Sequence, residues 1–150
     1  MTPRFLLLLL APVVGALIAV QAAANAALSK ALGGNVPFAS LSLIAVAGAA
    51  MLLAIILSGA RPPSAVAFST APPWAYVGGV IVAFYVVAIT FLAPRLGVGA
   101  AITLVVTGQI LGGMLVDHFG LLRSTAFPVT APRLVGAGLM VIGAFLALRR

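Results

Sequence analysis

Acidic residues and cysteine are almost missing from this chain. Its 150 residues include one Asp or Glu, one His and no Cys, whereas eight are Lys or Arg. Without Cys there are no disulfides, thiolate ligands or thiol nucleophiles. A single acid and a single His exclude paired-carboxylate catalysis, a catalytic triad and a carboxylate-rich metal site. We therefore expect no enzymatic activity, no catalytic residues, no metal and no cofactor.

Charge of either sign is scarce, and apolar residues are abundant. Charged residues make up 6% and hydrophobic residues 64% of the chain, whereas about a quarter of a soluble domain is charged. Except for the pair at residues 149 and 150, the cations are scattered singly along the chain. The net charge of +7 is therefore not gathered into a basic cluster that could bind nucleic acid. The composition predicts an integral membrane protein whose first partner is the lipid bilayer.

Gly, Pro and charged residues divide the apolar sequence into five segments, and such residues are typical of helix ends. The segments do not alternate as β-barrel strands do, and most have the length of a membrane-spanning helix. We predict one all-α domain, residues 1–150, with helices at about 5–28, 38–57, 74–92, 98–116 and 134–148. The last is short, so it is expected to begin a few residues earlier or to lie with little tilt.

The first apolar segment has a second interpretation. Arg4, an apolar run and the small residues after it are also typical of a cleavable secretory signal. The run is longer than a typical signal core, and we favour a membrane span.

The eight cations divide evenly between the two sides of a five-helix chain. The side of the N-terminus has Arg4, Arg61, Arg123 and Arg133, and the other side has Lys30, Arg95, Arg149 and Arg150. Orientation normally follows an excess of Lys and Arg on the cytoplasmic side, so this tie supplies no orientation signal. Either the chain inserts both ways, or a partner or subtle placement breaks the tie.

Five helices are few for enclosing a transport pathway, and many transporters use two inverted repeats. A second copy in inverted orientation would supply the missing repeat. We therefore predict an antiparallel homodimer.

Several polar residues fall inside the predicted spans, where they are costly and tend to face a bundle interior or a water-filled cavity. Gln21, Asn25 and Ser29 share one face of the first helix, since their spacing is four residues. Gln109 and Tyr85 lie near the middle of their spans. We predict substrate binding by Gln21, Asn25, Gln109 and Tyr85. Interhelical hydrogen bonding and core packing are the alternative roles.

Small residues line the last two predicted helices. Gly108 and Gly112 form a GxxxG motif, which permits close approach between helices. The fifth helix adds Gly136, Gly138 and Gly143. We expect these five glycines to pack helices, either within one chain or between two copies.

Asp117 and His118 end the fourth predicted helix. As the only acid and the only His, they are the candidates for proton or ion coupling. The alternative is structural, because an acid at a helix end near Arg123 and Arg133 forms a salt bridge.

Two stretches of the sequence resemble the YdcZ type of the drug/metabolite transporter superfamily. They are GALIAVQAAANAALSKALG, from Gly15 to Gly33, and GQILGGMLVDHFGLL, from Gly108 to Leu122. The resemblance implies a five-helix bacterial inner-membrane exporter that acts as an antiparallel homodimer, as a heterodimer with a paralogue, or as a fused protein. It also implies roles for Gln21, Asn25, Gln109, Asp117 and His118. Small multidrug-resistance proteins of this superfamily carry a glutamate in the first helix, whereas here Gln21 and Asn25 do not titrate.

The leading functional hypothesis is a secondary transporter that exports a small polar or amphipathic metabolite by alternating access. A small dual-topology anion channel and a non-transporting accessory membrane subunit are the alternatives. Conductance far above carrier turnover would favour the channel.

The even distribution of cations predicts that C-terminal reporter fusions will report both sides of the membrane. A pair of reporters, one active only in the cytoplasm and one active only outside it, measures this distribution. A C-terminus on one side in every molecule would refute dual insertion.

Overall fold

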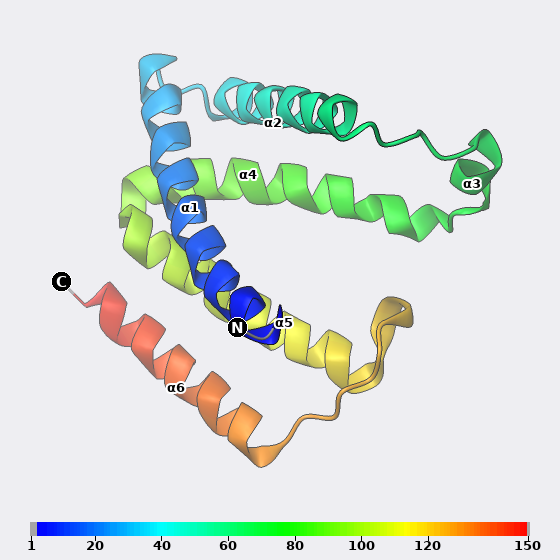
Figure 1. The fold of residues 1–150 in the computed structure, drawn as a ribbon. Coiled ribbons are helices and arrows are strands. Elements are labelled where there is room, and N and C mark those ends of the chain that lie inside the picture. The colour runs from blue at the N-terminus through cyan, green and yellow to red at the C-terminus, as the bar shows by residue number, and fades with distance from the viewer. Residues whose placement is uncertain (1–2, 150) are drawn as a thin grey trace. The chain divides into compact units, whose positions relative to one another are not determined.

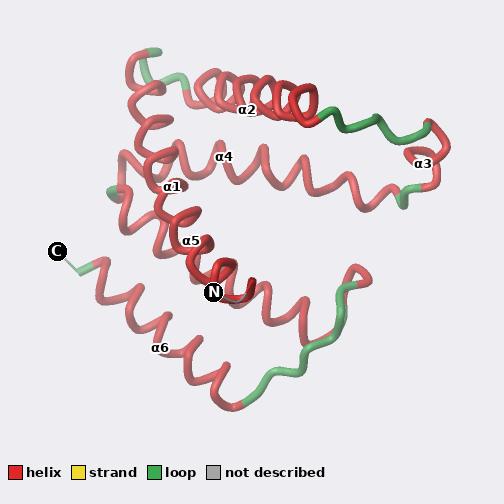
Figure 2. The backbone as a smooth tube through the Cα atoms, viewed as in Figure 1, coloured by secondary structure: helices red, strands yellow, loops and turns green. Residues whose placement is uncertain are grey.

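Residues 3–149 are described by the computed structural model, and all their regular structure is helical (Figures 1 and 2). The elements are α1 (Pro3–Ala31), α2 (Val36–Ser58), α3 (Ala65–Thr70), the 3-10 turn η1 (Pro73–Tyr76), α4 (Val77–Leu96), α5 (Val98–Phe119), the 3-10 turn η2 (Leu121–Arg123) and α6 (Ala131–Leu148).

Five helical segments of the described chain are long and apolar enough to cross a membrane, which confirms the five predicted spans. They are Leu8–Ala31, Val36–Ser58, Pro73–Leu96, Val98–Phe119 and Ala131–Leu148. The last begins three residues earlier than the apolar run, as expected, because Pro132 lies in its first turn, where proline is accommodated. The predicted break at 59–73 contains an unexpected short helix, α3, which Ser64 caps by accepting a hydrogen bond from the Ala67 N–H.

A tight turn reverses the chain between α1 and α2. Gly33 and Gly34 have φ angles of 67° and 85°, which side-chain-bearing residues rarely adopt. The side chain of Asn35 then caps α2 by accepting a hydrogen bond of 3.3 Å from the Phe38 N–H. These local preferences bring the end of α1 and the start of α2 to the same side of the membrane.

The chain divides into two compact units, Met1–Phe91 and Leu92–Arg150, and each is described here by itself. The division falls inside α4, close to Pro94. Proline has no N–H, so it removes the backbone hydrogen bond that the carbonyl of Thr90 would accept in an α-helix. The two units are therefore joined at a turn of helix with a weakened hydrogen-bond ladder.

Large apolar side chains of the described residues are mostly exposed, whereas most of the fully buried positions are small, with Ile89 as a large exception. Leu57 is 78% exposed and Phe84 is 76% exposed, while Ala22 and Ala39 are fully buried. Exposed apolar surface of this extent suits lipid or a second chain rather than water. Small residues let helix backbones approach closely in a membrane, where packing replaces the hydrophobic effect.

Candidate functional site

A buried polar cluster lies inside the first unit, with one side chain from each of three helices. Asn25 of α1 is 2% exposed, Ser40 of α2 is 1% exposed and Thr90 of α4 is fully buried. The fully buried Ala22 and Ala39 flank the cluster on α1 and α2. Because alanine is small, the helices approach closely enough for the three polar side chains to meet.

The hydroxyl of Thr90 is the centre of this cluster. The Asn25 Nδ2 donates to Thr90 Oγ1, and Ser40 Oγ donates to the same oxygen at 3.4 Å. The Thr90 hydroxyl donates in turn to the carbonyl of Val86, one turn earlier in α4, at 2.7 Å. The hydroxyl protons of Ser40 and Thr90 are thus used within the protein.

Hydrogen-bond acceptors in the cluster are not all satisfied. The Oδ1 atom of Asn25 is buried and has no hydrogen-bond partner among the described residues. The carbonyl of Thr90 also loses its usual helical donor because residue 94 is proline. An unpaired buried polar group costs about 1–3 kcal/mol, so Asn25 Oδ1 is an acceptor for which a donor from outside would be favourable.

The three cluster residues lie at a similar depth below one membrane face. Asn25 and Thr90 each precede the end of their span by six residues, and Ser40 follows the start of its span by four. At 1.5 Å per residue these separations are about 9 Å and about 6 Å. The cluster is therefore off the midplane, beneath the face where α1 ends and α2 begins.

The other polar residues predicted on α1 and α4 lie on the same two helices that carry Asn25 and Thr90. Ser29 is 4% exposed and shares the buried face of α1 with Asn25, whereas Gln21 is half-buried at the edge of that face. Tyr85 is half-buried and lies five residues before Thr90 in α4. Ser40 and Thr90 were not among the residues predicted from the sequence. The sequence features that could have identified them are the depth in the membrane that they share with Asn25 and the proline four residues after Thr90.

In the second unit, the predicted site residue Gln109 is exposed on α5. The neighbouring hydroxyls of Thr103 and Thr107 donate to carbonyls of their own helix, Gly99 and Thr103, both at 2.8 Å. These hydroxyls are therefore satisfied by their own helix. The amide of Gln109, by contrast, is exposed at the surface of the unit.

The glycines predicted to pack helices are not in close contact within their own unit. A Cβ atom added at Gly108, Gly112, Gly136, Gly138 or Gly143 would meet no neighbouring atom within 4 Å.

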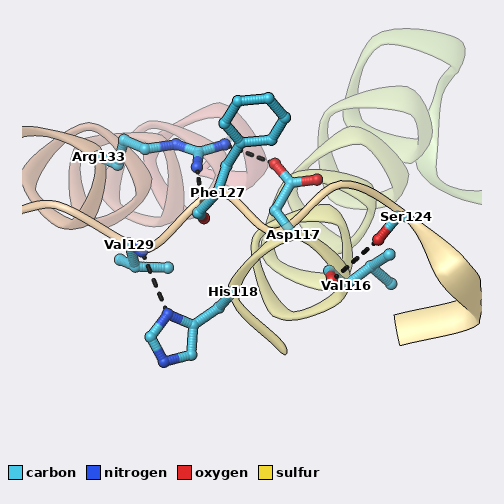
Figure 3. Close-up of polar contacts among 7 residues, drawn as sticks. All are labelled: Val116, Asp117, His118, Ser124, Phe127, Val129 and Arg133. Atoms are coloured by element: carbon cyan, nitrogen blue, oxygen red, sulfur yellow. Dashed lines mark hydrogen bonds and ion pairs between the residues drawn. The ribbon is translucent and has the colours of Figure 1, made fainter. Parts of the chain in front are cut away.

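Polar contacts of Asp117, His118 and Arg133 hold the segment after α5 against the end of that helix (Figure 3), and we call these contacts the clasp. The guanidinium of Arg133 lies 2.8 Å from Asp117 Oδ2, and it also donates to the carbonyl of Phe127 at 3.3 Å. His118 Nδ1 accepts a hydrogen bond of 3.2 Å from the Val129 N–H. Asp117, the single acid of the chain, thus forms a salt bridge with Arg133. Such a salt bridge was the alternative to a role in proton or ion coupling. The side chain of Arg123 lies outside the described residues.

An open groove between α5 and α6 adjoins this ion pair. Its volume is about 510 Å³, and apolar or small residues form most of its wall, with Asp117 and Arg133 at one end. The remaining lining residues are Ile110, Gly113, Met114, Gly136, Ala137 and Met140.

Comparison with protein families agrees with this multi-pass membrane architecture. A family model described as "Putative inner membrane exporter, YdcZ" matches residues 6–146. That description is of a transporter rather than of an enzyme. Searches among curated proteins and among solved structures found no match.

Replacement of Thr90 by Val is expected to destabilise the protein by removing the acceptor that Asn25 and Ser40 share. Each donor left unpaired costs about 1–3 kcal/mol. Thr103→Val is the matched control, because that hydroxyl contacts only a carbonyl of its own helix. Equilibrium unfolding in mixed micelles measures the free energy of both variants. Equal losses would show that the cluster does not stabilise the unit.

The clasp predicts that His118→Ala will expose the backbone N–H of Val129 to solvent. Loss of one hydrogen bond worth about 0.5–1.5 kcal/mol would speed exchange of this amide by about two- to tenfold. Hydrogen–deuterium exchange of the 124–130 segment measures the change, with Thr125→Ala in the same segment as control. Unchanged exchange at Val129 would mean that His118 does not hold the segment.

Proposed function

The chain belongs to this YdcZ family of inner membrane exporters, and we propose that it exports a small polar or amphipathic metabolite by alternating access in an antiparallel homodimer. The observation that carries the proposal is the polar cluster of Asn25, Ser40 and Thr90. A buried amide oxygen without a partner is costly inside a membrane protein, and transient occupation by a solute gives it a function.

The distribution of cations and the exposed residues of α5 and α6 support the proposal of a second copy. The even division of the eight cations supplies no preferred orientation. Gln109 is exposed, and the glycines of α5 and α6 have no close neighbour within their unit. An inverted partner would cover these surfaces and complete an inverted repeat without gene fusion.

Alternating access also needs a point at which the structure can bend. The division between the two compact units falls at Phe91 and Leu92, between Thr90 and Pro94. A proline-weakened turn is a common place for a membrane helix to kink. Because Thr90 belongs to the cluster, we propose that solute binding and bending of α4 are coupled.

In this proposal Gln21, Asn25 and Gln109 bind the solute and Tyr85 forms an apolar wall beside it. Asp117 and His118 are the candidate residues for coupling to protons. Loss of the ion pair between Asp117 and Arg133 and of the hydrogen bond from the Val129 N–H to His118 would release the segment before α6.

Two variants with opposite orientation biases test the antiparallel arrangement. Ala60→Lys with Thr125→Lys adds two cations on the side of the N-terminus, making six against four. Leu32→Lys with Arg61→Gln leaves three against five. All four positions are exposed. We expect each variant alone to lose transport, because its copies all face one way, and the two expressed together to regain it.

Transport is measured in proteoliposomes with labelled sugars, amides, organic cations and organic anions. Wild-type protein and a variant with two lysines on opposite sides, Ala60→Lys with Leu32→Lys, are the controls. Full activity of either biased variant alone would contradict the antiparallel dimer. Ionic currents far above carrier turnover would contradict alternating access.

A further inference from the structure

The cluster of Asn25, Ser40 and Thr90 also carries information about the chemistry of its ligand. We propose that it binds an uncharged solute through hydroxyl or amide N–H donors, with Asn25 Oδ1 as the principal acceptor. This inference deepens the proposed function and rests on it.

The buried side-chain atom left unpaired among the described residues is an acceptor. Asn25 Oδ1 has no partner among the described residues, and Pro94 supplies no N–H to the carbonyl of Thr90. The hydroxyl protons of Ser40 and Thr90 are already donated within the cluster. A ligand that pairs with Asn25 Oδ1 must therefore bring a donor, and an anion, which only accepts hydrogen bonds, cannot pair with this oxygen.

A cationic donor is excluded by charge. The only acidic residue in the chain is Asp117, which belongs to the other unit and is paired with Arg133 at 2.8 Å. An inverted second copy would bring the same paired carboxylate. A cation at Asn25 would thus lose its hydration without gaining a counter-charge, and burial of an unpaired charge is strongly unfavourable. Neutral hydroxyl and amide donors have no such cost.

The depth of the cluster agrees with a polar ligand that enters from water. Asn25 and Thr90 lie about 9 Å from the ends of their spans, so a small solute needs to cross only part of the membrane to reach them. Because both residues are buried in the described structure, the solute reaches the acceptor only when the helices separate.

Thermal unfolding of the purified protein in detergent tests the inference with probes of three charge classes. The probes are myo-inositol and N-acetylglucosamine as neutral donors, tetraphenylphosphonium as a cation and benzoate as an anion, all at millimolar concentration. A ligand that binds only the folded state raises the unfolding temperature. We expect stabilisation by a neutral donor alone.

Two substitutions of Asn25 sharpen this test. Asn25→Leu removes the acceptor. We expect it to weaken binding of the neutral donor about tenfold or more, because the donor of the bound solute would be left buried without a hydrogen-bond acceptor. Asn25→Asp places a carboxylate in the cluster and is expected to add stabilisation by tetraphenylphosphonium. Asn35→Asp makes the same change of charge at an exposed position and retains a side chain that caps α2, so it is expected to add none.

The outcomes separate this inference from the proposed transport. Stabilisation of wild-type protein by the cation or the anion, by no probe, or equally in Asn25→Leu would overturn the inference. The wild-type measurements decide the matter even if Asn25→Asp fails to fold. If neutral donors bind through Asn25 but no labelled solute crosses proteoliposomes, the binding site stands and the transporter proposal falls.

Discussion

The fold of the first unit depends on how polar groups are satisfied away from water. In hydrocarbon, the amide of Asn25 must find partners within the protein, and it donates to the Thr90 hydroxyl of α4, which also accepts from the Ser40 hydroxyl of α2. These bonds tie three helices, and the small residues Ala22 of α1 and Ala39 of α2 are fully buried. The arrangement uses the hydroxyl donors of the cluster and leaves Asn25 Oδ1 without a partner among the described residues, and this oxygen is the acceptor of the binding site that we propose.

We base the proposed second copy on features in the remainder of the chain. Its large apolar side chains face outward, its cations favour neither side of the membrane, and its α5 and α6 glycines lack close neighbours within their unit. The clasp of Asp117 and His118 on the 124–130 segment has a different character, because it uses charge and ring nitrogens at the membrane edge, where water is near. An ion pair and a histidine hydrogen bond thus hold the segment at the membrane edge, whereas hydrogen bonds between uncharged side chains join the helices in the interior.

The five spans could be predicted from the sequence because apolar length and Gly/Pro punctuation determine them directly. Asn25 could be identified as a candidate because an amide is conspicuous in an apolar helix. Ser40 and Thr90 could not, since a hydroxyl in a helix can be satisfied by its own backbone, as Thr103 and Thr107 are. The sequence also left the role of Asp117 open, because a salt bridge to Arg133 depends on how the 120–130 segment folds back. Ligand binding by Gln21, Gln109 and Tyr85 stays a prediction.

The central claim is that Asn25 Oδ1 is an acceptor available to a neutral solute. The chain has two asparagines, Asn25 and Asn35, and Asn35→Asp retains a residue that caps a helix. In that background, ¹³C-labelled asparagine reports Asn25 alone by solid-state NMR in bilayers. The account predicts that a neutral hydroxyl or amide donor shifts the Asn25 ¹³Cγ resonance while tetraphenylphosphonium leaves it unchanged. A resonance that responds to no neutral donor, or that responds to the cation instead, would contradict it.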